Sequence, residues 1–68
     1  MQIEKIIKER RDVLHITQQN LAEMAGIGLR TLKSIENGKG NPSLQTINKI
    51  ADILGMEIQL TIKNKNNQ

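Results

Sequence analysis

The reactive side chains of this chain are too few and too scattered to build a catalytic centre. It has no cysteine and a single histidine, His15, whereas a structural zinc ion usually takes four Cys or His ligands. No hydroxyl–histidine or carboxylate–histidine set stands at a spacing typical of nucleophilic catalysis. Gly38-Lys39-Gly40 lacks the Walker pattern and the preceding strand of a phosphate-binding loop. We therefore expect no enzyme activity, no metal site and no cofactor.

The chemistry that remains is electrostatic. Ten Lys and Arg against seven Asp and Glu give a net charge of +3, which favours anionic partners. The chain has no aromatic residue, so a module that stacks single-stranded bases on aromatic side chains is disfavoured. No apolar run approaches the roughly 18 residues that cross a bilayer, and the first residues lack the apolar core of a signal peptide. We expect a cytoplasmic protein without membrane contacts.

Helices are predicted to position the basic residues. Apolar residues at three- and four-residue spacing predict four of them, over about residues 3–14, 18–25, 29–36 and 44–54. Thr17 and Ser43 are suitable N-caps for the second and fourth helices. Gly26 suits the left-handed conformation that commonly ends a helix. With 68 residues the chain holds one small domain at most.

The apolar positions of these helices are expected to face a common core. In the first helix they are Ile3, Ile6, Ile7 and Leu14. In the second and third they are Leu21, Ala22, Ala25, Leu32 and Ile35. In the last they are Leu44, Ile47, Ile50, Ala51 and Leu54.

The period changes to strict alternation at the C-terminal end, which predicts a half-buried strand. Its apolar residues are Met56, Ile58, Leu60 and Ile62. A lone strand in a helical monomer leaves its backbone groups unpaired, so we expect it to pair with the same strand of a second copy in a homodimer. These four residues form the expected dimer interface. The domain is predicted to span 1–63, with the dimerisation strand over 56–62 and a flexible tail over 64–68.

The stretch from Thr17 to Gly38, TQQNLAEMAGIGLRTLKSIENG, sets two short helices around a glycine turn, which is the helix-turn-helix arrangement. It resembles the Cro and lambda-repressor type family in Gln18, Leu21-Ala22, Gly26, Leu32 and Ile35-Glu36-Asn37-Gly38. Pro-Ser-Leu at 42–44 and Ile-Ala-x-x-Leu-Gly at 50–55 extend the likeness over nearly the whole chain. The resemblance implies an all-α, lambda-repressor-like bundle of about five short helices, plus the C-terminal β-strand pairing across a homodimer.

The resemblance also implies that the third helix enters the major groove of double-stranded DNA. The implied base contacts come from Leu29, Arg30, Lys33 and Ser34, and the implied phosphate contacts from Gln18, Thr31, Asn37, Lys39 and Asn41. The fork of Arg30 fits the O6 and N7 edge of guanine. A simpler interpretation, that these side chains are ordinary solvated surface, stays open. Arg11 and Glu36 align with a family pair that bridges the first and third helices, which implies a structural ion pair.

A narrower resemblance concerns the turn at 26–30 and the segment 54–60, which are similar to small HipB-like antitoxins. It implies an autorepressing regulator that binds a palindromic operator as a dimer, with a HipA-like kinase toxin as a possible partner. The alternatives are a stand-alone phage or mobile-element repressor and a protein-only interaction module. His15 departs from the glycine that the family usually has at this position, so we expect a strained or differently shaped turn there.

Overall fold

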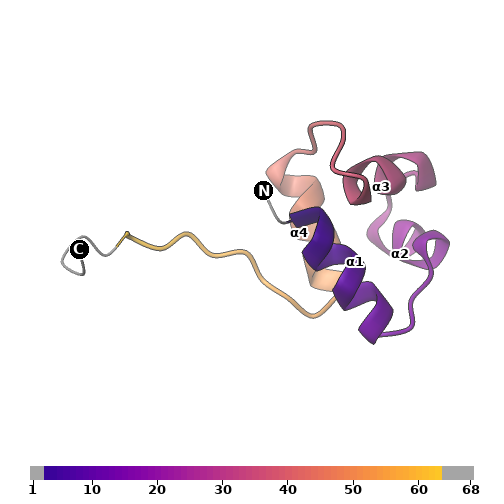
Figure 1. Cartoon of the computed structure of the whole chain (residues 1–68), viewed down its shortest axis with the longest axis horizontal. Helices are drawn as coiled ribbons and strands as arrows, with labels where there is room; N and C mark the ends of the chain where they lie inside the picture. The colour runs from indigo at the N-terminus through magenta and orange to yellow at the C-terminus, as the bar shows by residue number, and fades with distance from the viewer. Residues whose placement is uncertain (1–2, 64–68) are drawn as a thin grey trace.

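The computed structural model describes residues 3–63, which form four helices (Figure 1). They are α1 (Ile3–Val13), α2 (Gln18–Ala25), α3 (Leu29–Glu36) and α4 (Leu44–Ile53). The four predicted helices are confirmed, with ends within one residue. In the described part of the chain no helix has the length and apolar composition needed to cross a membrane. The tail predicted over 64–68 lies outside the described residues.

The core lies where the four helices meet. α2 packs against α3 and α4, and α1 packs against α3. The most deeply buried side chains are Leu21, Leu32, Ile50 and Leu54. Each buried aliphatic side chain of this size contributes about 1.5–3 kcal/mol before the entropy of ordering is subtracted. The helix-turn-helix pair is therefore fixed in place by the same side chains that stabilise the domain.

Three side chains expected in the core lie at its edge. Ile6, Leu14 and Leu44 are 44%, 38% and 62% exposed. Ile6 is one residue, about a quarter of a helical turn, from the buried Ile7, so it lies on the flank of α1. Leu14 follows the last residue of α1 and Leu44 opens α4. The inward positions predicted for these three residues are wrong. Periodicity indicates which face of a helix is apolar, but it does not indicate how much of that face the neighbouring helices cover.

Side-chain caps are present at the two helix starts where the sequence predicts them. Thr17 Oγ1 accepts a hydrogen bond from the N–H of Asn20 at 3.0 Å, and Ser43 Oγ accepts one from the N–H of Thr46 at 3.1 Å. Each cap satisfies a backbone donor that the first helical turn leaves without a partner. The starts of α2 and α4 are thus determined by bonds that span three residues.

All four helices end in one hydrogen-bond pattern. After α2 the N–H of Gly26 donates to Glu23 O, and the N–H of Ile27 donates to Ala22 O at 2.9 Å. This is the Schellman motif, whose turning residue adopts a left-handed conformation; φ is 70° at Gly26. The same bonds end the other helices, turning at His15, Gly38 and Gly55. Three helices therefore turn at glycine, and α1 turns at a histidine with φ of 57°.

We expect His15→Gly to stabilise the domain by about 0.5–1 kcal/mol. A left-handed conformation costs a residue with a Cβ about 1–2 kcal/mol, and part of that gain is lost to the larger unfolded-state entropy of glycine. A change of this size raises the melting temperature of a small domain by several degrees. Thermal unfolding followed by circular dichroism measures it.

His15→Ala is the matched control, since it removes the imidazole and keeps the Cβ. It should leave the melting temperature unchanged or lower it. Equal stabilisation by both variants would show that the imidazole, and not the backbone conformation, is responsible.

Residues 56–63 form neither the predicted strand nor a fifth helix within the single chain. Beyond Gly55 this segment leaves the bundle and runs away from it (Figure 1). A strand needs a neighbouring strand as its hydrogen-bond partner, and the described residues 3–55 supply only helices and loops. The expected bundle is confirmed as all-helical with four helices rather than about five. Pairing of the segment with a second copy stays a prediction.

Candidate nucleic-acid interface

The outward face of α3 carries three of the four side chains predicted to contact bases. Leu32, Ile35 and Glu36 are buried, so their side of α3 packs against the core. At 3.6 residues per turn the opposite direction falls on Arg30 and Ser34, with the exposed Lys33 beside them. Leu29 is half-buried, because it lies on the flank nearest Leu32 and Glu36. Leu29 is therefore only partly available to a ligand.

A shallow groove joins this face to the following loop. Its volume is about 320 Å³, and Arg30 and Ser34 line it together with Lys39 and Asn41. Thr31, also predicted to contact phosphate, lines the same groove. The structure thus brings predicted base-contacting and phosphate-contacting residues together, although up to eleven positions separate them in the sequence. We call this surface the basic groove.

The other predicted side chains lie outside the basic groove. Lys33 and Asn37 are exposed and do not line it. Gln18 lies at the start of α2 and is half-buried. The predicted dimer residues, Met56, Ile58, Leu60 and Ile62, belong to the segment beyond Gly55, which follows α4.

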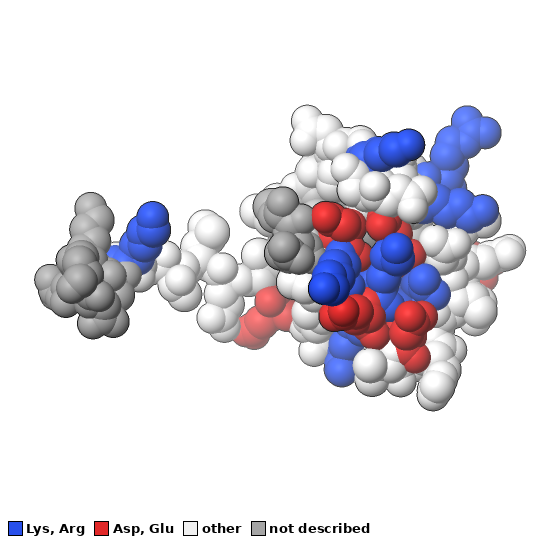
Figure 2. Space-filling model, in the orientation of Figure 1, with Lys and Arg blue, Asp and Glu red and all other residues white. Residues whose placement is uncertain are grey.

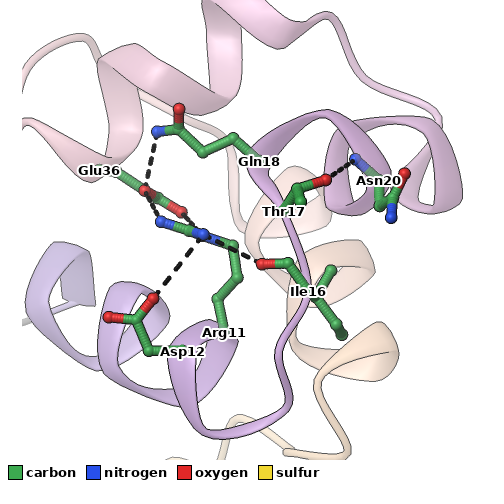
Figure 3. Close-up of polar contacts among 7 residues, drawn as sticks. All are labelled: Arg11, Asp12, Ile16, Thr17, Gln18, Asn20 and Glu36. Atoms are coloured by element: carbon green, nitrogen blue, oxygen red, sulfur yellow. Dashed lines mark hydrogen bonds and ion pairs between the residues drawn. The ribbon is translucent and has the colours of Figure 1, made fainter.

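A buried carboxylate connects three of the helices. Glu36 is 2% exposed and accepts bonds from Arg11 Nε at 2.9 Å and Arg11 Nη2 at 3.1 Å. This two-point contact is the strongest geometry for an arginine–carboxylate pair. Arg11 Nη1 also donates to the carbonyl of Ile16 at 3.0 Å, so the guanidinium ties α1 both to α3 and to the turn before α2 (Figure 3). Arg11 and Glu36 thus stand in the contact expected of a structural ion pair.

The third hydrogen bond to Glu36 is a contact that the sequence analysis missed. Gln18 Nε2 donates to Glu36 Oε1 at 3.0 Å, from the first residue of α2 to the last of α3 (Figure 3). Because the amide carries two N–H groups, one still has no partner among these contacts. Gln18 is therefore held in place before any ligand arrives. No local sequence signal indicates this bond, since 18 residues separate its ends.

Electrostatics distinguish the α3 end of the molecule from α1. The hydrogen bond that Arg11 donates to Glu36 raises the pKa of the Arg11 guanidinium above its ordinary value. Arg11 and Glu36 carry opposite formal charges, so the pair adds no net charge beside α3. Within residues 3–63, Arg30, Lys33 and Lys39 of α3 and its loop take part in no salt bridge. Figure 2 shows acidic and basic side chains mixed over α1, whereas Lys and Arg alone appear at the α3 end.

The α3 surface has the features expected of a site that binds an extended polyanion. In the part of the chain that the structure describes, no three His, Asp or Glu side chains gather as metal ligands do. What the surface offers is one helix with a polar outward face, flanked by cationic and amide side chains. A helix of this kind fits the major groove of B-DNA, and flanking donors contact its phosphates.

Comparison with known proteins agrees with this geometry. A family model described as Helix-turn-helix matches residues 7–60, which includes α2, α3 and the loop between them. An uncharacterized HTH-type transcriptional regulator of Methanothermobacter thermautotrophicus is 40% identical over 52 residues, covering 76% of this chain and 75% of the relative.

Two relatives carry more specific names. The cryptic phage CTXphi transcriptional repressor RstR of Vibrio cholerae is 34% identical over 58 residues, covering 85% of this chain and 52% of the relative. The immunity repressor protein of Bacillus phage phi105 is 37% identical over 60 residues, covering 88% of this chain and 39% of the relative. The chain therefore spans about half the length of the first repressor and less of the second.

Proposed function

Because the chain belongs to the Cro/C1-type helix-turn-helix family, we propose that it is a transcriptional repressor that binds a palindromic operator as a homodimer. The observation that carries the proposal is the basic groove, where the outward face of α3 meets the loop after it. The repressor acts by covering promoter DNA, with no catalytic step. It works in the cytoplasm, where its operator lies.

Two kinds of contact follow from this placement. Arg30 and Ser34 point away from the core and face base edges when α3 enters the major groove. Lys39 and Asn41, on the loop, lie along the phosphate backbone and supply affinity without sequence preference. Gln18 adds a phosphate contact through its second amide N–H, and Glu36 holds its orientation.

Arg30→Ala should cost about 1–3 kcal/mol on the preferred duplex and relax the preference at one base pair, because a guanine then loses its two-point contact. Lys39→Ala should weaken all duplexes to a similar extent, since a phosphate contact carries no sequence information. The preferred duplex is obtained by selection from a random library with the full chain. Fluorescence anisotropy on that duplex and on a scrambled one measures both variants.

Each variant serves as the control for the other, because one should affect sequence preference and the other only overall affinity. Equal losses for Arg30→Ala on both duplexes would remove it from the base-contacting residues. Failure of the wild-type chain to enrich any duplex would favour the protein-only interaction module instead.

The dimer is proposed to form through Met56, Ile58, Leu60 and Ile62. One α3 helix contacts one half-site, and a C2 dimer presents two such helices to a palindromic site. Linking the two heads makes the second contact intramolecular and multiplies the affinity. The proposed interface lies in the segment beyond α4, away from α3, so dimer contacts and DNA contacts do not compete for residues.

Two biological roles fit this activity. The relatives named as phage repressors support a stand-alone repressor of a phage or mobile element. The similarity of residues 26–30 and 54–60 to HipB-like antitoxins supports an autorepressor with a HipA-like kinase toxin as partner. Co-purification with the product of an adjacent kinase-like reading frame distinguishes them: a stable complex indicates the antitoxin, and its absence the stand-alone repressor.

A further inference from the structure

An apolar groove lies along α1 and α4. Its volume is about 500 Å³, and side chains of α1, α4 and residues 56–58 line it. Ile6 and Leu44 line it and are 44% and 62% exposed. Large aliphatic side chains gathered in one groove favour contact with another apolar surface.

The segment 56–63, which we call the arm, begins at this groove. Ile58 lines the groove and is 38% exposed, whereas Leu60 and Ile62 are 96% and 97% exposed. Gln59 Nε2 donates to Glu57 Oε2 at 2.9 Å, and Glu57 also lines the groove beside Ile58. Side chains two residues apart therefore share a side, as in a strand. The arm is extended, with one apolar and one polar side, and runs away from its own bundle (Figure 1).

We propose that the arm pairs antiparallel with the arm of a second copy, with Leu60 on the two-fold axis, and that the pair closes both apolar grooves. The inference rests on the homodimer of the proposed function and specifies its geometry. Residues directly opposite each other in antiparallel strands point to the same side. Apolar residues therefore meet apolar residues only when the axis passes through a residue rather than between two.

Charge and apolar pairing together select one register, because an axis at Thr61 would set Glu57 opposite Lys65 but Ile58 opposite Asn64. The arm has two charged residues, Glu57 and Lys63. They lie opposite each other only when the axis passes through Leu60, because each is three residues from it. With the axis at Gln59, Glu57 faces Thr61 instead. The register centred on Leu60 opposes Glu57 with Lys63, Ile58 with Ile62, and Gln59 with Thr61.

In this register a side chain of the second copy reaches each apolar groove. Ile58 lines the groove of its own chain, and Ile62 of the second copy lies opposite Ile58. The partner arm therefore brings an aliphatic side chain to the open edge of the groove, near Ile6 and Leu44. By symmetry the second groove receives Ile62 of the first copy, so the contact closes as a dimer.

Single-cysteine variants of the full chain test the register, since the chain has no cysteine of its own. Residues opposite each other have Cα atoms about 4.5–5.5 Å apart, within the range of a disulfide. Leu60→Cys should therefore form a crosslinked dimer rapidly under mild oxidation. Gln59→Cys and Ile58→Cys should crosslink much more slowly, because their symmetry mates lie beyond about 7 Å. Faster crosslinking of either variant than of Leu60→Cys would overturn the register.

Charge reversal supplies a second measurement. Glu57→Lys or Lys63→Glu alone creates two like-charged pairs and should raise the dimer dissociation constant about tenfold, while the double exchange restores it. Sedimentation equilibrium measures all three. A dimeric wild type with no crosslinking at 58, 59 or 60 and no charge effect would overturn this interface, including the dimer residues proposed above, and would leave a homodimer that forms through another surface. A monomeric wild type would overturn the dimer itself.

Discussion

Raising the salt concentration from 50 to 200 mM should weaken the complex with the selected duplex by about 10³–10⁵-fold. Three to five phosphate contacts per subunit amount to about six to ten per dimer, and each releases condensed counterions from DNA. The positive side chains of α3 and its loop, Arg30, Lys33 and Lys39, are the source of the counterion release, and Gln18 at the start of α2 adds an uncharged phosphate contact. Fluorescence anisotropy titrations at several salt concentrations give the slope of log affinity against log salt.

Two lysine variants test whether the salt dependence comes from the basic groove. Each removes one positive charge, but from a different part of the surface. Lys39→Ala should reduce the slope by about 1 for each phosphate contact removed. Lys8→Ala removes the same charge from an exposed site on α1 and should leave the slope nearly unchanged. A wild-type affinity that hardly varies with salt would contradict DNA binding through the basic groove and indicate a protein partner.

Arg11→Met should destabilise the domain by about 3–5 kcal/mol. The substitution leaves Glu36 buried, with only Gln18 as a hydrogen-bond donor. Breaking a buried ion pair from one side carries a cost of this size, because the remaining charge cannot be solvated. A domain of 68 residues has a total stability of only about 3–10 kcal/mol. Urea unfolding should therefore show a transition midpoint at a much lower urea concentration than that of the wild type.

The double variant Arg11→Met with Glu36→Leu separates the uncompensated charge from lost packing. Removing both charges avoids the buried lone carboxylate, so much of the stability should return. Lys8→Met is the control for the substitution itself, since Lys8 is exposed on the same helix. A double variant as unstable as Arg11→Met would show that the arginine acts through its packing and its bond to Ile16.

The same pair predicts little dependence on alkaline pH. Glu36 raises the folded-state pKa of Arg11 above its unfolded value. A group with a raised pKa contributes its stability fully below the unfolded value and loses it only as pH rises through the folded one. Both values lie in strongly alkaline solution. The contribution of Arg11 should be constant from neutral to moderately alkaline pH.

Much of the helical framework was predictable because the interactions that end helices are local. The caps at Thr17 and Ser43 span three residues, and the turn at Gly26 depends on one backbone conformation. The strain at His15 followed from the same reasoning. The outward stripe of α3 was equally accessible, since a period of 3.6 residues places Arg30 opposite Leu32 once the helix is known.

The arm shows where pattern reasoning stops. Alternation predicts Ile58, Leu60 and Ile62 on one side of the segment, and the bond between Gln59 and Glu57 joins two of the polar residues of that pattern. The pattern could not make a strand by itself, because a strand exists only through hydrogen bonds to another backbone. The single chain offers none within residues 3–63.

By itself the sequence determined the helices, their ends and which side of each is apolar, since these depend on residues within one or two turns. Only the tertiary structure decided that Gln18 is held by Glu36, that Asn41 joins Arg30 in the basic groove, and that Leu44 is left exposed. Each of these depends on how one helix or loop is placed relative to another. That placement results from the packing of side chains such as Leu21, Leu32 and Ile50, and packing is a property of the assembled core rather than of any local stretch.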